Sequence, residues 1–258
     1  MKILFLGDVV AKSGREAVIN NISAIQQANG IDFTIVNAEN AAHGKGITQK
    51  IYNQLIDAGA DVITLGNHAF AKKEIHGVID DCPFMVRPAN LNPVELGSSM
   101  VIRECCDKKI TVINLLGRIF MNMATDDPVL VLEEMMEKEI EADIIIVDLH
   151  GEATSEKIIF AEYFAERLTA VIGTHTHVQT ADERLIKGCA FITDAGMCGP
   201  WDSVLGRDIE EVISHHVDKE TTHYLPASGP SVICGCIIEV DDTTNRAVGI
   251  ERLQIRPS

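Results

Sequence analysis

Short apolar runs that each end in a polar residue recur along this chain and constrain its fold more than any other feature. In the first part of the chain such runs lie at Lys2–Leu6, Phe33–Val36 and Val62–Leu65. A helical pattern follows each of them, over residues 15–28, after Thr48 and over residues 72–80. Strands of a buried parallel sheet have this apolar character, and helices connect them. The repeated unit therefore predicts an α/β fold with a helix-covered sheet.

The later part of the chain adds further strand patterns. They lie at Asp143–Leu149, Ala170–Ile172, Phe191–Asp194, 232–240 and 247–254. Residues 99–104 and 109–115 flank a short polar turn and predict a hairpin. Because no linker, repeat or low-complexity segment separates these patterns, we expect residues 1–258 to form a single domain.

Composition narrows the classes of function. The formal net charge of -16 argues against a long nucleic acid held through its phosphates and agrees with a small substrate. No apolar run reaches the ~18 residues of a membrane span, and Gly7-Asp8 ends the first apolar run too early for a signal peptide. The seven cysteines form no Cys-x-x-Cys pair, which excludes zinc-ribbon and thioredoxin-like sites. We therefore expect a cytoplasmic protein.

Side chains that can ligate metals follow many of the predicted strands. They are Asp8, Glu39, Asn40, Asn67, His68, His150, His175 and His177. An isolated His-x-His is more often a pair of surface loop residues. Here the separate strand ends favour one convergent site, because the carboxyl ends of parallel strands meet at one sheet edge. Carboxylate, amide and imidazole donors together suit a pair of first-row divalent ions, whereas structural zinc prefers thiolates.

This pattern resembles the calcineurin-like metallophosphoesterases, which carry Asp-x-His, Gly-Asp, Gly-Asn-His, a lone His and Gly-His-x-His at successive strand ends. The corresponding motifs span nearly the whole chain in the same order: Gly7-Asp8, Glu39-Asn40, Gly66-Asn67-His68, His150 and His175-Thr176-His177. Val10 stands where the first motif has its histidine, and Ala38-Glu39-Asn40 replaces Gly-Asp. These departures are similar to those of the YmdB-like branch, a group of bacterial phosphodiesterases. Arg87-Pro88-Ala89-Asn90 and Gly196-Met197-Cys198-Gly199-Pro200 support the same resemblance.

The resemblance implies two packed mixed β-sheets flanked by helices, a metallophosphoesterase-like four-layer sandwich. It also implies two metal ions, with iron or manganese favoured and zinc allowed. One ion would bind Asp8, Asn40 and His177, the other Asn67, His150 and His175, and Glu39 would bridge the two. His68, which is not needed as a ligand, is then the expected catalytic residue that protonates the leaving oxygen. A histidine that only orients a ligand is the alternative.

The implied activity is a phosphodiesterase that opens 2′,3′-cyclic or 3′,5′-cyclic nucleotides by attack of a metal-bridging hydroxide on phosphorus. A phosphomonoesterase or protein phosphatase on the same site is one alternative, and a metal-bound regulatory protein with weak catalysis is another. The expected partner is a small phosphodiester substrate, without membrane attachment. Closed symmetric homo-oligomers are common, which gives the expectation of an even-numbered assembly.

Other polar residues near the expected site carry weaker signals. His43 and Lys45 lie in a Gly-bearing loop and would touch phosphate if the loop covers the site, but a solvated loop is the simpler interpretation. The loop does not match a nucleoside triphosphate P-loop. Arg87 and Arg118 would clamp an anion or pair with surface acids.

Overall fold

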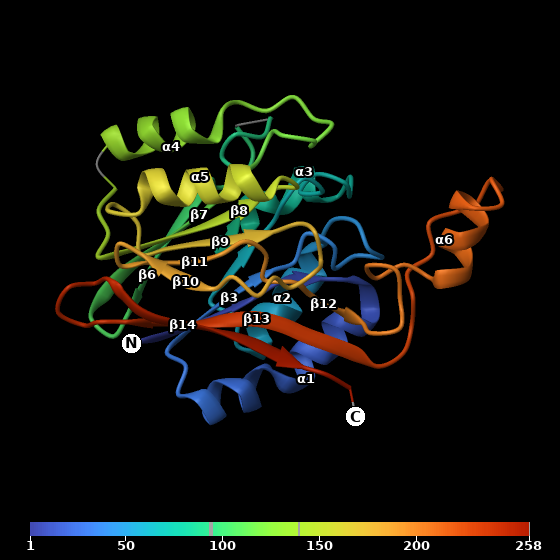
Figure 1. The fold of residues 1–258 in the computed structure, drawn as a ribbon, viewed down its shortest axis with the longest axis horizontal. Helices are drawn as coiled ribbons and strands as arrows, with labels where there is room; N and C mark the ends of the chain where they lie inside the picture. The colour runs from blue at the N-terminus through green and yellow to red at the C-terminus, as the bar shows by residue number, and fades with distance from the viewer. Residues whose placement is uncertain (93–94, 139, 258) are drawn as a thin grey trace.

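A computed structural model describes residues 1–92, 95–138 and 140–257 of the chain (Figure 1). The strands of its first sheet are β1 (Lys2–Leu6), β2 (Asp8–Val9), β3 (Phe33–Asn37), β4 (Val62–Thr64), β5 (Met85–Val86), β12 (Met197–Pro200), β13 (Ser231–Val240) and β14 (Ala247–Ile255). Their order is β2-β12-β13-β1-β3-β4-β5, and β14 pairs with β13. The sheet is mixed, because β1, β3, β4 and β5 run parallel while β13 runs antiparallel to β1 and β14.

The second sheet consists of β6 (Met100–Cys105), β7 (Lys108–Leu116), β8 (Ile144–His150), β9 (Ala170–Thr174), β10 (Arg184–Ile186) and β11 (Cys189–Ile192). Their order is β10-β11-β9-β8-β7-β6. The four central strands are parallel, and the two edge strands, β6 and β10, are antiparallel to their neighbours. The hairpin predicted over residues 99–115 is confirmed as β6 and β7.

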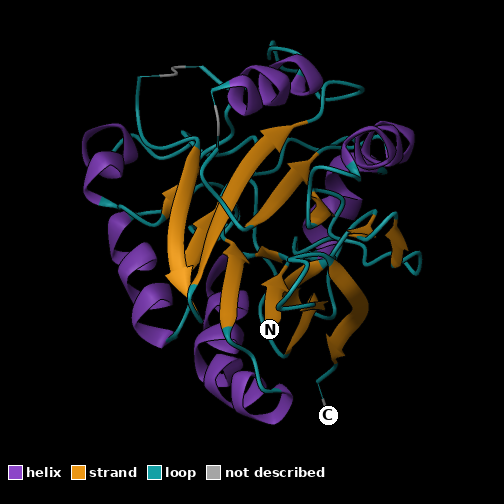
Figure 2. Ribbon diagram, turned by 90° about the vertical axis from the view of Figure 1, so that its left-hand side faces the viewer, coloured by secondary structure: helices purple, strands orange, loops and turns teal. Residues whose placement is uncertain are grey.

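Helices cover the outer faces of the two sheets, as the turned view makes plain (Figure 2). They are α1 (Ala11–Asn29), α2 (Gln49–Ala58), α3 (Ile75–Val78), the 3₁₀ helix η1 (Ile79–Asp81), α4 (Pro128–Glu137), α5 (Thr154–Phe164) and α6 (Ile209–His216). α6 is an exception, because it protrudes from the body of the molecule (Figure 1). The predicted class, two packed mixed sheets flanked by helices, is confirmed.

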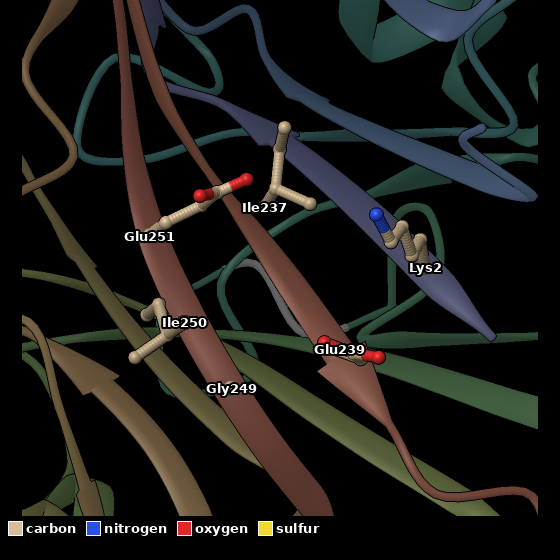
Figure 3. A pocket seen from close by; sticks show the side chains of 6 residues that line it. All are labelled: Lys2, Ile237, Glu239, Gly249, Ile250 and Glu251. Atoms are coloured by element: carbon tan, nitrogen blue, oxygen red, sulfur yellow. The ribbon is translucent and has the colours of Figure 1, made fainter. Parts of the chain in front are cut away.

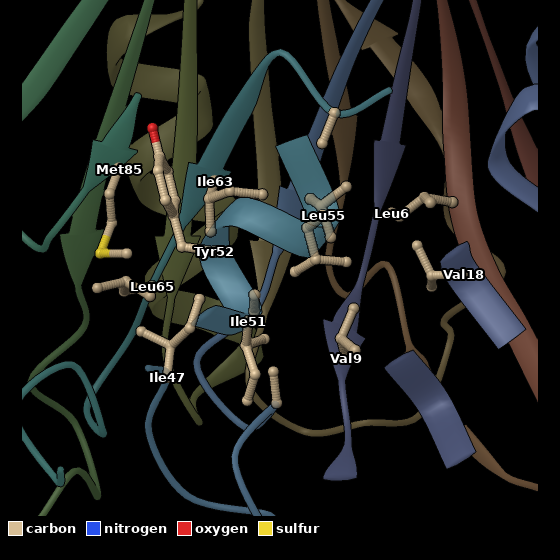
Figure 4. Packing of buried hydrophobic residues seen from close by; sticks show 14 of the residues in the cluster. Leu6, Val9, Val18, Ile47, Ile51, Tyr52, Leu55, Ile63, Leu65 and Met85 are labelled. Carbon is tan, nitrogen blue, oxygen red and sulfur yellow. The ribbon is translucent and has the colours of Figure 1, made fainter. Parts of the chain in front are cut away.

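Side-chain alternation along β1 explains the layers. Leu6 packs in one cluster with Val18 of α1 and Leu55 of α2 (Figure 4). Leu4, on the same side of the strand, belongs to this cluster. Ile3 and Phe5 belong to a second cluster, which fills the space between the two sheets. Successive strand residues point to opposite faces, so a strand buried on both faces needs an unbroken apolar sequence.

Two helices differ from the sequence prediction. α1 begins at Ala11 rather than at residue 15, because Val10 offers no capping side chain and so leaves no sequence signal for the start. The helix expected over residues 72–80 is only the short α3, continued by η1. The cap predicted at Thr48 is confirmed, since its hydroxyl accepts a hydrogen bond from the Ile51 amide at 3.3 Å.

Within the described part of the chain, no helix is long and apolar enough to cross a membrane.

Candidate metal centre

The predicted site residues come from strand ends of both sheets. Asp8 follows β1, Glu39 and Asn40 follow β3, and Asn67 and His68 follow β4. From the second sheet, His150 ends β8, and His175 and His177 follow β9. The two groups meet where the sheets face each other. The backbone amide of His175, for example, donates a hydrogen bond to Asp8 Oδ2 at 3.0 Å.

His150 stands at the middle of the convergence. Its Nε2 atom lies 2.9 Å from Asn67 Oδ1, 3.2 Å from Glu39 Oε1 and 3.1 Å from His175 Nδ1. Glu39 and His150 are buried, and His175 is partly exposed to the cavity. Ligand atoms of Glu39, His150 and His175 all lie within 4.8 Å of one another, which is a spacing that can hold a metal ion.

A chain of buried hydrogen bonds determines which nitrogen of His150 faces this cluster. The Thr174 hydroxyl donates to Asp148 Oδ1 at 2.6 Å and lies 2.9 Å from His150 Nδ1. Asp148 also accepts from Asn37 at 2.9 Å and from Thr64 at 2.6 Å, so its position is fixed by both sheets. Because the hydroxyl proton is directed at Asp148, His150 Nδ1 must donate to the hydroxyl oxygen. The Nε2 lone pair of neutral His150 then faces the cluster.

The donors in this cluster fit a cation. A carboxylate oxygen of Glu39 and an amide oxygen of Asn67 lie 3.2 and 2.9 Å from His150 Nε2, and in the neutral imidazole this nitrogen offers a lone pair to a cation between them. Asp8 is fully buried, and its Oδ1 atom has no hydrogen-bond partner. A buried carboxylate oxygen left unpaired is costly, and a bound cation removes that cost. The residues present therefore fit a metal site.

A second part of the cluster lies around Asn40 and His177. Asn40 Nδ2 is 2.8 Å from Glu39 Oε1 and 3.1 Å from His177 Nε2. His177 Nδ1 lies 2.9 Å from the carbonyl oxygen of Leu205 and donates to it, which leaves Nε2 facing Asn40 and the cavity. Glu39 thus contacts both parts of the cluster, the position that a bridging ligand requires.

The ionisation of these groups is strongly perturbed. Burial works to raise the pKa of Glu39, but the neighbouring His150 outweighs it and lowers that pKa. Burial alone would lower the pKa of His150, but the Glu39 carboxylate outweighs burial and raises it. Burial and His150 lower the pKa of His175 to about 3, and burial raises the pKa of Asp8 to about 6. Without a cation, a proton on His150 balances Glu39. A metal ion would take over that role.

The loop that carries His175 and His177 is held in an unusual conformation. Both residues have positive φ, 106° and 66°, a region that residues with a Cβ atom rarely adopt. The buried carboxylate of Asp194 accepts a hydrogen bond from the Thr176 amide at 2.9 Å and pairs with Lys157 Nζ at 3.1 Å. This buried ion pair keeps the two imidazoles aimed at the cluster.

His68 lies in the cavity beside the cluster. Its backbone amide donates to Glu39 Oε2 at 3.0 Å, and its partly exposed ring lines the same cavity as Glu39 and His175. Burial lowers the pKa of His68, Glu39 opposes that shift and Lys45 adds to it. The ring is thus placed to meet a bound ligand.

Of the weaker candidates, only Lys45 reaches the cavity. His43 lines a separate hollow with Arg15 and Lys72. Arg87 is buried and donates to backbone carbonyl oxygens, including that of Pro88 at 2.8 Å, which is a structural role. Arg118 pairs with Asp127 at 3.3 Å, away from the cluster.

Several residues of the site carry no clear sequence signal. They are Asp148, Thr174, Glu152, Leu205, Arg207 and Tyr224. Asp148 interrupts the apolar run of β8, and a charged residue at a buried strand position is the one hint that was available. Leu205, Arg207 and Tyr224 come from irregular segments around α6.

A second cavity, of about 250 Å³, lies on the first sheet over β1, β13 and β14 (Figure 3). Its walls are Lys2, Ile237, Glu239, Gly249, Ile250 and Glu251. Neither histidine nor cysteine lines it, so it lacks the donor set of the candidate metal centre.

Comparison with known proteins places this geometry in a family. Residues 4–253 match the family model of the YmdB-like proteins. A 2′,3′-cyclic-nucleotide 2′-phosphodiesterase of Bacillus subtilis (strain 168) is 46% identical over 257 residues, which cover 99% of this chain and 97% of that protein.

Two solved structures share the whole fold. The crystal structure of a novel phosphatase from Mycoplasma pneumoniae superimposes with a TM-score of 0.94 at 38% identity, covering 99% of this chain and 93% of the other. A hypothetical protein from Thermus thermophilus superimposes with a TM-score of 0.93 at 35% identity, covering 100% of both chains.

Proposed function

Because the chain belongs to the YmdB-like family of metallophosphoesterases and is a hydrolase, we propose that it opens 2′,3′-cyclic nucleotides in a metal-dependent reaction. The substrate class follows the B. subtilis relative, whose name specifies the 2′-phosphodiester. Opening the ring at the 2′ oxygen would leave a nucleoside 3′-monophosphate. A cytoplasmic location is part of the same proposal.

The convergence of oxygen and nitrogen ligand atoms around His150 Nε2 carries this proposal. Asn67 Oδ1 and Glu39 Oε1 lie 2.9 and 3.2 Å from that atom, and Asp8 Oδ1 is buried without a hydrogen-bond partner. We propose that Asp8, Asn40 and His177 hold one metal ion, that Asn67, His150 and His175 hold a second, and that Glu39 bridges them. Iron and manganese suit these oxygen and nitrogen donors.

When bound, the ions would supply Lewis acidity to the phosphoryl group and lower the pKa of an attacking water. The chain's own residues prepare the site for this. Asp148 and Thr174 fix the tautomer of His150, and the Asp194–Lys157 pair fixes the loop of His175. Such fixed donors need no rearrangement when charge develops on the substrate.

His68 is the proposed catalytic acid. Its ring lines the cavity and is not needed as a ligand, so a protonated His68 is free to give its proton to the leaving 2′ oxygen. Burial of the ring lowers its pKa, Glu39 opposes that shift, and the neighbouring Lys45 ammonium adds to it. A proton donor at this place affects turnover more than binding.

The first test is hydrolysis by metal-free protein reloaded with Mn²⁺ or Fe²⁺. We expect cleavage of bis-p-nitrophenyl phosphate and of 2′,3′-cyclic AMP, the latter giving 3′-AMP by chromatography. Asp8→Asn should lose this activity. His68→Ala should keep its metal content and lose about 10²–10⁴-fold in kcat.

Other results of this hydrolysis test would assign a different function to the site. Faster cleavage of p-nitrophenyl phosphate than of any diester would establish a phosphatase. Full metal loading without turnover of either ester would establish a regulatory protein. Retained kcat in His68→Ala would remove the proton-donor role and leave His68 as an orienting residue.

A further inference from the structure

One wall of the metal cavity is built by two segments distant in sequence. The cavity, of about 460 Å³, is lined by Lys45 from the loop after β3 and by Arg207 and Tyr224, which flank α6. The same cavity is lined by Glu39 and His68. A volume of this size lies in the range of small-molecule sites, and a ligand bound at the strand ends would contact this wall.

Tyr224 joins the two segments. Lys45 Nζ lies 5.2 Å from the centroid of its ring, and Arg207 Cζ lies 5.1 Å from it. Its hydroxyl donates to the Gly44 carbonyl oxygen at 3.4 Å. Gly44 has φ +78°, and a Cβ atom there would lie 2.2 Å from the Tyr224 hydroxyl, so only glycine permits this close approach.

The two cations of the wall differ in their partners. Arg207 is neutralised by Glu211, with guanidinium–carboxylate distances of 2.7 to 3.2 Å, and Thr222 holds the same carboxylate at 2.6 Å. Lys45, by contrast, forms no ion pair among the described residues, and the Tyr224 ring is the contact of its ammonium. Arg207 is therefore part of the support, and Lys45 presents a full charge to the cavity.

We propose that Lys45, supported by the ring of Tyr224, is a substrate-binding residue that contacts a phosphoryl oxygen of the nucleotide held at the metal centre. This inference rests on the proposed function, because it names the group that binds the phosphate of that substrate. An ammonium provides three donors and a point charge, which suits a phosphoryl group whose other oxygens face the metals. Tyr224 limits the range of positions of a long, flexible side chain, so less conformational entropy is lost when the substrate binds.

The test compares Lys45→Ala with Lys50→Ala in the metal-loaded full-length protein. Lys50 is exposed, lies close in sequence and lines the separate hollow, which makes it a matched control. We expect KM for 2′,3′-cyclic AMP to rise about tenfold or more in Lys45→Ala, as for loss of a charge-assisted hydrogen bond. The inhibition constant of inorganic phosphate should rise similarly, kcat should change less, and Lys45→Arg should recover part of the loss. An unchanged KM and an unchanged inhibition constant would overturn the inference.

Tyr224 is tested as a positioning residue. Tyr224→Phe keeps the ring but loses the hydrogen bond to Gly44, so it should raise KM less than Tyr224→Ala does, and Tyr224→Ala should raise KM by a smaller factor than Lys45→Ala. Because Tyr224 acts through Lys45, the double variant should be no worse than Lys45→Ala alone. Additive effects would contradict this linkage and give Tyr224 an independent contact.

Failure of this inference is distinguishable from failure of the proposed function. If wild type cleaves cyclic nucleotides and Lys45→Ala matches it in KM and in phosphate inhibition, the function stands and the inference falls. If wild type cleaves no diester, titration calorimetry with inorganic phosphate still decides: weaker binding by metal-loaded Lys45→Ala supports Lys45 as the anion contact, and equal binding removes it.

Discussion

Two parts of the metal cavity are built by different means. We call the buried residues around His150 the floor and the segments that carry Lys45, Arg207 and Tyr224 the wall. On the floor, Asp8, Glu39, His150 and Asp148 are fully or almost fully buried, and most of their side-chain polar atoms have a polar partner within about 3 Å. On the wall, Lys45 is exposed, and it meets Tyr224 through a cation–π contact at 5.2 Å. Sheet strands place the floor, whereas loops place the wall.

The contrast shows how one cavity separates two tasks. Metal chemistry needs donors fixed to within a fraction of an ångström, and strands with packed neighbours provide that precision. Substrate recognition tolerates movement, and an exposed cation–π contact contributes only about 0.5–1 kcal/mol. Mutations on the floor should therefore have large effects on metal binding or stability, while mutations on the wall change KM.

The largest effect is expected for Glu39→Gln on the floor. The amide removes the charge that would bridge two cations, so bound metal and activity should fall together, the latter by about a thousandfold. Glu152→Gln is the matched control: it borders the same cavity, with His175 Nε2 3.3 Å away, but its side chain is half exposed. The measurements are the amount of bound metal and kcat, each compared between the two variants and the wild type. Equal losses of metal and of kcat in Glu39→Gln and Glu152→Gln would mean that the buried Glu39 is no more important for metal binding than the half-exposed Glu152.

The next effect concerns the support beneath the floor. Lys157→Met leaves the buried Asp194 carboxylate without its cation, and removing one partner of a buried ion pair costs about 3–5 kcal/mol. Chemical denaturation of metal-free protein measures this loss. Lys187→Met is the control, since Lys187 pairs with Glu166 at the surface, where such pairs contribute about 0–1 kcal/mol. Similar losses for both lysines would contradict the role given to the buried pair.

A smaller effect is expected when the tautomer of His150 is no longer fixed. Thr174→Val keeps the shape of the side chain but removes the hydroxyl between Asp148 and His150, and loss of such partners weakens metal binding about 10–100-fold. Thr174→Ser restores the hydroxyl and should recover most of the affinity. Titration of metal-free protein with Mn²⁺ gives the measurement. Equal affinities for all three proteins would show that the hydroxyl does not orient the ligand.

The same division explains what the sequence predicts. Apolar runs that end in Asp, Asn or His reveal strand ends, and the topology of parallel strands brings those ends together. All the predicted site residues accordingly lie in or beside one cluster, although their roles stay predictions. The packing of two mixed sheets came from the family resemblance, since local periodicity does not report which sheets face each other.

The wall could not be predicted because its contacts are between residues far apart in the chain. Lys45 and Tyr224 meet across segments that carry no strand or helix pattern of their own. The hydroxyl of Thr174 was missed for a different reason: it acts through His150, and a threonine in a strand is ordinary. The start of α1 at Ala11 was missed because no capping side chain marks it.

The smallest effect is expected at the edge of the floor, where Asp182 holds the segment that follows His177. The carboxylate accepts hydrogen bonds from Thr180 at 2.6 Å and from the Thr193 amide at 3.1 Å. Burial opposes its ionisation, but these hydrogen bonds lower the pKa of Asp182 below its usual range. A lowered carboxyl pKa stabilises the folded state at pH values above the ordinary carboxyl pKa of about 4. This contribution is lost as the pH falls through the folded-state pKa.

Asp182→Asn should therefore lower Tm by about 2–4 °C at pH 7 and by less near pH 3. The control is Asp202→Asn, at an exposed position, which should leave Tm unchanged at both pH values. A difference in Tm that stays constant from pH 7 to pH 3 would show that the charge of Asp182 is not what holds the segment.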